Sequence, residues 1–141
     1  MGMKVKTAAL IAAGIALVES VLILAGNVPP LAAYAAENLF FTLLIYLVLI
    51  YCASGFAGNL KKGAAAGAEI ALSANIVYAF AIFIGRALGV PVLGVSMPDM
   101  LSLAFVILVS LILNTLLGAL AGVVVAWIAG KVTAKKKGNP S

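Results

Sequence analysis

Four long apolar stretches alternate with short polar segments along this chain of 141 residues. An α-helix needs about 20 apolar residues to cross the hydrocarbon core of a bilayer, and each stretch is close to or above that length. Backbone groups in lipid must bond within their own segment, so the pattern predicts helices rather than strands. The predicted spans are Thr7–Ala25, Leu39–Ala57, Ala64–Leu88 and Leu101–Ala129.

Composition supports this interpretation. The chain is 65% hydrophobic and 9% charged, whereas a soluble domain carries about 25% charged residues. We therefore predict an all-α, polytopic membrane protein in which residues 1–141 form a single membrane domain. The expected architecture is a four-transmembrane-helix bundle made of two antiparallel hairpins, followed by a basic C-terminal tail at 131–141.

Basic residues gather on one side of this four-span arrangement. All except Arg86 fall there, and they are Lys4, Lys6, Lys61, Lys62, Lys131, Lys135, Lys136 and Lys137. The positive-inside rule places both termini and the Lys61–Lys62 loop in the cytoplasm, in a multi-pass protein of the cell membrane. A cleaved signal peptide ending at Ala33-Tyr34-Ala35 is the competing interpretation. It is disfavoured because the first apolar run exceeds the usual 7–15 residues and contains Glu19.

The residue types that the sequence lacks narrow the classes of function to expect. The chain has no His and a single Cys, Cys52. It therefore lacks the commonest metal ligand and general base, and it has no cysteine pair for a disulfide or a zinc cluster. We expect no metal, no cofactor and no enzymatic activity. The net charge of +5 forms no basic patch with interleaved aromatics, so it does not indicate nucleic acid; the expected partner is the lipid bilayer.

The two predicted hairpins echo each other. Val28-Pro29-Pro30-Leu31 recurs as Val90-Pro91-Val92-Leu93, and the same offset pairs Glu37 with Asp99. Duplication would give a parallel repeat, with the acidic residues at helix N-termini. Chance agreement between two apolar sequences is the alternative.

Small residues recur at every fourth position on three of the predicted helices, which places each set on one helix face. Such faces let backbones approach closely, and close packing drives helix association in lipid. The sets are Ala8, Ala12, Ala16 and Ser20; Gly63, Gly67 and Ala71; and Gly118, Gly122 and Ala126. The pattern leaves open whether the partner lies in this chain or in another copy.

Aromatic residues distinguish the second predicted helix, which is expected to face lipid over most of its length. Phe40, Phe41 and, on the fourth helix, Trp127 are typical of interfacial anchors. Tyr46 lies too deep for that role, so its hydroxyl needs a partner or a wet cavity.

Ionisable residues at membrane depth are costly and usually pair or line a pathway. Glu19 and Arg86 lie at similar predicted depth in the outer leaflet, which favours either a structural ion pair or an outer binding site. Glu69 lies about two turns into the third helix. It either reaches the interface or a loop lysine, or forms an inner proton or cation site.

Two asparagines lie near mid-membrane, Asn75 on the third predicted helix and Asn114 on the fourth. Their matching depth predicts an interhelical hydrogen bond worth about 0.6–2 kcal/mol. The alternative is that the two asparagines form a polar track together with Glu19 and Glu69.

The run Ser54-Gly55-Phe56-Ala57-Gly58, the basic Lys62-Gly63 entry to the next helix, and Gly118–Gly122 resemble small uncharacterised prokaryotic four-helix membrane proteins in their layout. That resemblance implies a Gly-rich helical bundle and no particular activity. Two functions follow from the residues. The first is a structural or assembly protein that packs as a homo-oligomer or in a larger membrane complex. The second is a small oligomeric transporter or channel for an ion or small solute that uses Glu19, Glu69 and Arg86.

Overall fold

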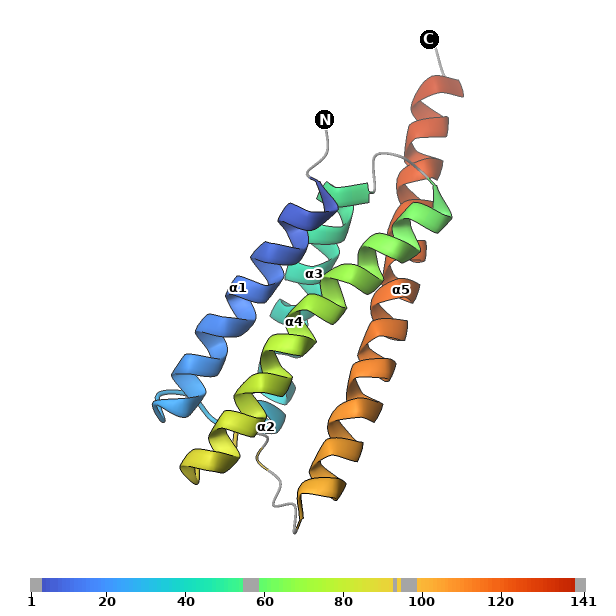
Figure 1. Ribbon diagram of the computed structural model, residues 1–141. Coiled ribbons are helices and arrows are strands. Elements are labelled where there is room, and N and C mark those ends of the chain that lie inside the picture. Colours follow the sequence, from blue (N-terminus) through green and yellow to red (C-terminus); the bar gives the residue numbers. More distant parts are fainter. Residues whose placement is uncertain (1–3, 55–58, 93, 95–98, 139–141) are drawn as a thin grey trace.

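The computed structural model describes residues 4–54, 59–92, 94 and 99–138. All regular structure in these residues is helical, which confirms the predicted all-α class. One short helix lies between the first and second of four longer ones (Figure 1). In chain order the helices are α1 (Val5–Leu24), α2 (Leu31–Glu37), α3 (Leu39–Ser54), α4 (Leu60–Leu88) and α5 (Met100–Gly138).

Three helices are long and apolar enough to cross a membrane, namely α1, α4 and the Met100–Val132 part of α5. The apolar part of α3, Phe40–Ala53, is shorter. The 16 residues of α3 cover about 24 Å by helical rise, less than the roughly 30 Å of a hydrocarbon core. The second span was predicted to end at Ala57, which lies outside the described residues.

The helix ends differ from the predicted span ends. Hydropathy identifies the residues that suit the lipid core, whereas capping and helix propensity determine where a helix begins and ends. α4 begins four residues before the predicted Ala64, since the side chain of Asn59 accepts backbone N–H bonds from Lys61 at 3.0 Å and Lys62 at 3.3 Å. α5 continues past the predicted Ala129 as far as Gly138, through lysines that favour helix.

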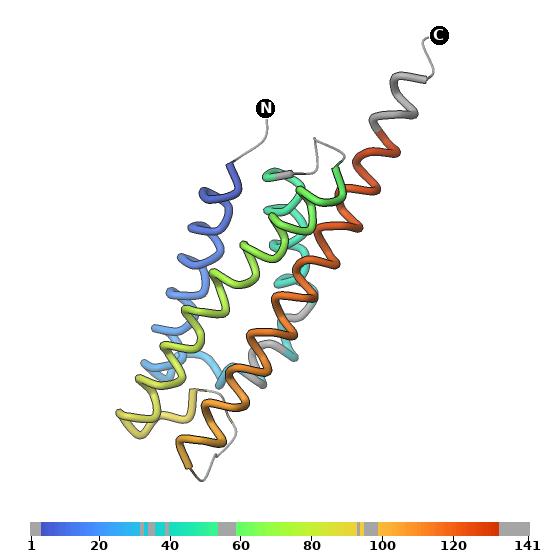
Figure 2. The backbone as a smooth tube through the Cα atoms, turned by 45° about the vertical axis from the view of Figure 1, so that its right-hand side comes forward, coloured from blue at the N-terminus to red at the C-terminus, as the bar shows by residue number. Residues whose placement is uncertain are grey.

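α4 is the central helix of the bundle. Its most extensive contacts are with α5 and then with α1, while α3 makes smaller contacts with the other three long helices. Figures 1 and 2 both show α4 running obliquely, from the upper part of α5 to the lower end of α1. The main partner of α1 is therefore α4 rather than α3, and the predicted arrangement in two hairpins is not confirmed.

The small-residue faces of α4 and α5 meet each other. A Cβ atom added at Gly67 would collide with the carbonyl group of Gly118, and one added at Gly122 would collide with that of Gly63. A Cβ atom at Gly118 would lie 2.5 Å from the side chain of Ala71. The backbones approach this closely because no side chains separate them. The contact contains all the predicted packing residues of the two helices, which are Gly63, Gly67, Ala71, Gly118, Gly122 and Ala126.

The third small-residue face belongs to α1 and packs inside the bundle. Its four residues Ala8, Ala12, Ala16 and Ser20 are all buried. The alanines pack in one apolar cluster with Ile70 and Ala74 of α4 and Leu49 and Ile50 of α3. All three predicted faces are thus occupied by helices of the same chain.

α1 and α4 end with the same cap. At each end the backbone N–H groups of two successive residues bond back three and five residues, and the first of the two is a glycine with positive φ. These are Gly26, with φ 80°, and Gly89, with φ 75°, a conformation that glycine adopts without steric cost. The segments that follow carry the Val-Pro echo and touch, because the N–H of Leu31 donates to the carbonyl of Val92 at 2.7 Å. This cap is common at helix ends, and the duplication stays a prediction.

The predicted helix N-terminal position is correct for Asp99 and wrong for Glu37. Asp99 precedes α5 and accepts the backbone N–H of Ser102 at 2.6 Å. Glu37 is the last residue of α2, and it is Asn38 whose carbonyl accepts the N–H of Thr42 in the first turn of α3. The extra short helix α2, which hydropathy does not reveal, accounts for the difference.

Candidate functional site

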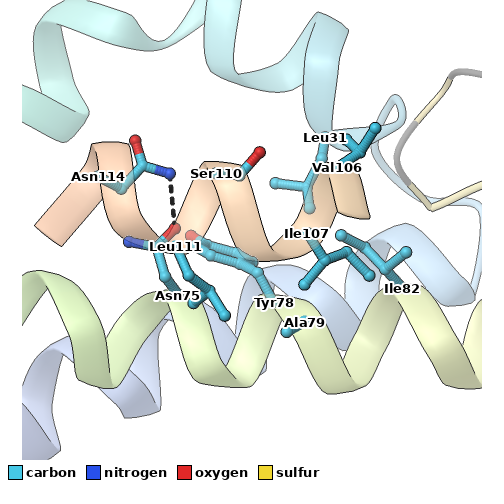
Figure 3. A pocket seen from close by; sticks show the side chains of 10 residues that line it. All are labelled: Leu31, Asn75, Tyr78, Ala79, Ile82, Val106, Ile107, Ser110, Leu111 and Asn114. Atoms are coloured by element: carbon cyan, nitrogen blue, oxygen red, sulfur yellow. Dashed lines mark hydrogen bonds between the residues drawn. The ribbon is translucent and has the colours of Figure 1, made fainter. Parts of the chain in front are cut away.

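A cavity of about 220 Å³ lies between α4 and α5. The two helices touch at their glycines near one end of the bundle and separate toward the other end (Figures 1 and 2). The cavity occupies part of the space between them and is open on one side. Two of its lining residues, Ile82 and Ile107, belong to an apolar cluster with Val92 and Leu103. Its lining residues are Leu31, Asn75, Tyr78, Ala79, Ile82, Val106, Ile107, Ser110, Leu111 and Asn114 (Figure 3).

The predicted hydrogen bond between the two mid-membrane asparagines is present at one end of this cavity. The side-chain amide of Asn114 donates to the side-chain oxygen of Asn75 at 3.0 Å, and the amide of Asn75 donates to the carbonyl of Ala71 at 2.7 Å (Figure 3). A side-chain amide has two N–H donors and an acceptor oxygen. These two bonds therefore leave the oxygen of Asn114 and one N–H of each amide with capacity for a ligand.

Tyr78 brings a second polar feature to the cavity. Its hydroxyl donates to the carboxylate of Glu19 on α1 at 2.5 Å. Glu19 lines a much smaller cavity, of about 10 Å³, together with Thr42 and Tyr46 of α3. Tyr78 lines both cavities.

The predicted pairing of Glu19 with Arg86 stays a prediction. Glu19 is bonded to Tyr78, and Arg86 lies eight residues further along α4, about 12 Å by helical rise. Arg86 is exposed in the last turn of α4, where its charge acts on Asp99 at the start of α5. Hydrogen bonds from Ser102, with a smaller contribution from Arg86, hold the pKa of the Asp99 carboxyl below its usual 3.8.

Glu69 stands apart from both cavities. Its side chain is exposed and lines a shallow groove between α1 and α4 together with Lys6 and Ser73. The lysine that shares its groove therefore comes from α1, not from the Lys61–Lys62 loop. Glu69 is not among the residues that line the cavities of Glu19, Tyr78 and the asparagines, and the polar track stays a prediction.

The aromatic anchors lie on the outside of the bundle. Phe40 and Phe41 are exposed and pack edge to face with ring centroids 6.0 Å apart. Trp127 is also exposed, and the ammonium group of Lys131 lies 4.5 Å from the centre of its ring. A tryptophan ring beside a lysine ammonium group is typical of a helix end at a membrane surface.

Sequence reasoning singled out Tyr46 as a deep hydroxyl that needs a partner, and missed Tyr78. Tyr46 does lie beside Glu19, as expected of a polar cavity. The signal for Tyr78 was available, since it lies one turn beyond Asn75 on the same helix. What spacing alone does not give is the rotation of α1 that points Glu19 at this tyrosine.

Among the described residues no three His, Cys, Asp or Glu side chains come together as a metal site would require. No family model, curated protein or solved structure matches this chain.

Proposed function

We propose that this chain is a multi-pass protein of the cell membrane that binds a small uncharged polar solute in the cavity between α4 and α5 and transports it. The observation that carries the proposal is the gathering of two amides and two hydroxyls in one otherwise apolar cavity, between two helices that are apolar enough to cross a membrane. Polar groups at membrane depth are costly unless they serve packing or a pathway. One asparagine bond suffices for packing, and the additional Tyr78 and Ser110 in the same cavity favour a ligand.

The lining favours an uncharged solute over an ion. No charged side chain lines the cavity in the described part of the chain, and an unpaired charge brought there would lose its hydration without compensation. The volume of about 220 Å³ corresponds to roughly seven water molecules at about 30 Å³ each. Small amides and polyols are uncharged and small enough for this volume.

The orientation follows from the lysines. The start of α1, the end of α3, the start of α4 and the end of α5 all lie at one end of the bundle (Figure 1), and this is the end that carries the lysines. We infer that α3 also crosses the bilayer, assisted by α2, and that this end faces the cytoplasm. Labelling of a cysteine at position 61 from outside intact cells would contradict this arrangement.

Assembly into a homo-oligomer or a larger complex is the second candidate. The observation in its favour is α5, whose 39 residues cover about 58 Å and project past the other helices (Figure 1). The projecting end offers a partner a contact that the bundle itself does not use. Against it, all three small-residue faces are already occupied within the chain.

Solute flux in proteoliposomes tests the transport proposal. Stopped-flow light scattering measures the permeation of urea, acetamide and glycerol into vesicles that contain the purified protein. We expect a rate above that of empty vesicles for at least one of the three. The double variant Asn75→Leu/Asn114→Leu should abolish the increase, since it removes both amides without leaving one unpaired.

Ser73→Ala is the matched control, because Ser73 lies on α4 close to Asn75 but bonds the backbone of Glu69 in the shallow outer groove. It should permeate like the wild type. Rates equal to those of empty vesicles for all three solutes would reject the proposal, and co-purification of a stoichiometric partner would then favour assembly.

A further inference from the structure

The shallow groove between α1 and α4 differs from the solute cavity in that it carries charge. It measures about 330 Å³ and is lined by Lys6, Ala9, Leu10, Ala13, Glu69 and Ser73. We propose that this groove binds the headgroup of phosphatidylethanolamine, a zwitterionic phospholipid with a primary ammonium group. Among the described residues the groove and the solute cavity share no lining side chain, so the two sites can be tested separately.

The groove faces lipid. Both of its walls belong to helices that are long and apolar enough to cross a membrane. On α4, Leu72 and Ile76 lie three and seven residues beyond Glu69 on the same helix face, and both are exposed. On α1, Leu10 is 73% exposed. Exposed apolar side chains that gather in this way mark a membrane contact, so the molecule that fills the groove is a lipid.

The level of the groove along the bundle suits a headgroup. Lys6 is the second residue of α1, at the end where the lysines gather, and a long lysine side chain reaches the headgroup region. Glu69 lies nine residues after the start of α4, about 14 Å along the helix axis. α4 runs obliquely across the bundle, however (Figures 1 and 2), so Glu69 reaches the same groove as Lys6.

The charges in the groove call for a ligand that carries both signs. An ionised group that faces lipid is costly unless it is paired. Lys6 and Glu69 line one groove, yet no ion pair joins them in the part of the chain that the structure describes. The hydroxyl of Ser73 donates to the backbone carbonyl of Glu69 at 2.8 Å, so its oxygen can still accept a hydrogen bond. The groove therefore offers one cation, one carboxylate and one neutral acceptor.

Phosphatidylethanolamine matches these three groups. Its phosphate is an anion for the ammonium group of Lys6, and its own ammonium has N–H donors for the Glu69 carboxylate and the Ser73 oxygen. The small side chains of Ala9 and Ala13 leave space beside them for the glycerol and the first acyl carbons. Phosphatidylcholine shares the phosphate, but its trimethylammonium group has no N–H donor. Phosphatidylglycerol shares the phosphate and has no cation for Glu69.

Native mass spectrometry of the full chain measures lipid binding from an equimolar mixture of these three phospholipids with identical acyl chains. We expect phosphatidylethanolamine to bind about 2–5-fold more than phosphatidylcholine, the range that an exposed ion pair supplies. Glu69→Gln should abolish this preference, because it keeps the shape of the side chain and removes its charge. Lys6→Gln should weaken the binding of both lipids alike, because both carry the phosphate.

Lys4→Gln and Glu37→Gln are the matched controls. Lys4 is exposed two residues before Lys6, Glu37 is exposed at the end of α2, and neither lines the groove. Both variants should bind the three lipids like the wild type. Equal binding of phosphatidylethanolamine and phosphatidylcholine by the wild type would overturn the proposal. A preference for phosphatidylglycerol would also overturn it, since lysine charge alone would then attract the lipid. Retention of the wild-type preference by Glu69→Gln would overturn the role of the carboxylate.

Discussion

The two halves of the α4–α5 interface differ in how closely the helices approach each other. At one end Gly63 and Gly67 meet Gly118 and Gly122 with no side chain between the backbones. At the other end the helices separate, and Asn75, Tyr78, Ser110 and Asn114 line a cavity. The comparison teaches that the close contact and the cavity belong to one interface: the helices diverge from the glycines, and the side chains between them at the other end leave part of the space unfilled. The glycines therefore support the site without contacting it.

The largest effect is expected where the glycines touch. Gly122→Ala places a methyl group against the carbonyl of Gly63, and this overpacking should cost about 1–3 kcal/mol of unfolding free energy. The variant should also lose solute flux, because the helices must move apart to admit the methyl group. Unfolding in a mixed-detergent titration, together with the vesicle assay, measures both.

Gly14→Ala is the same substitution in α1, where an added Cβ meets nothing within 4 Å. It should stabilise the helix by up to about 1 kcal/mol through propensity alone. Equal effects of the two substitutions would mean that the glycine contact does not hold the helices together.

The hydrogen bond between Asn75 and Asn114 should contribute less to the unfolding free energy than the glycine contact. Asn114→Leu leaves Asn75 without its interhelical donor and should cost about 0.6–2 kcal/mol. The double variant with Asn75→Leu should be milder than the sum of the two single ones, because no amide is then left unpaired. Additive costs in this double-mutant cycle would show that the bond makes no net contribution.

Asp99 should give α5 a local dependence on pH. Its folded-state pKa is lowered, chiefly by the hydrogen bonds from Ser102. A lowered pKa stabilises the fold above the unfolded value of about 3.8, and this contribution is lost as the pH falls through the folded-state pKa. Hydrogen exchange of the Ser102 amide should accelerate, relative to other capped amides, as that range is entered. Asp99→Asn should remove this pH dependence, and an unchanged profile would contradict it.

Substitution of Thr115 should have the smallest effect on stability. Its buried hydroxyl oxygen has no hydrogen-bond partner within the described structure. Thr115→Val keeps the shape and removes the unpaired group, so stability should stay equal or rise by up to about 1 kcal/mol. A clear loss of stability would reveal a bond that this hydroxyl makes in the membrane.

The same comparison shows what could be predicted from the sequence. The glycine faces and the asparagine bond were predictable, because spacing of four fixes a helix face and equal distance from the lysines fixes depth. The partner of Glu19 was not predictable from the sequence, because it depends on the rotation of α1 about its axis and on the tilt of α4. That tilt brings Tyr78 to the level of Glu19. The short helix α2 was also missed, because its seven residues merge with α3 in a hydropathy profile.

The most direct test of the central claim asks whether the space between α4 and α5 is open to water and to solute. In a Cys52→Ala background, Ser110→Cys places a thiol in the cavity, while Ile112→Cys places one two residues along α5 at an exposed apolar position. We predict that a membrane-impermeant thiol reagent labels the first and not the second, and that acetamide, urea or glycerol at saturation slows this labelling. Equal resistance of both thiols to the reagent would contradict the account.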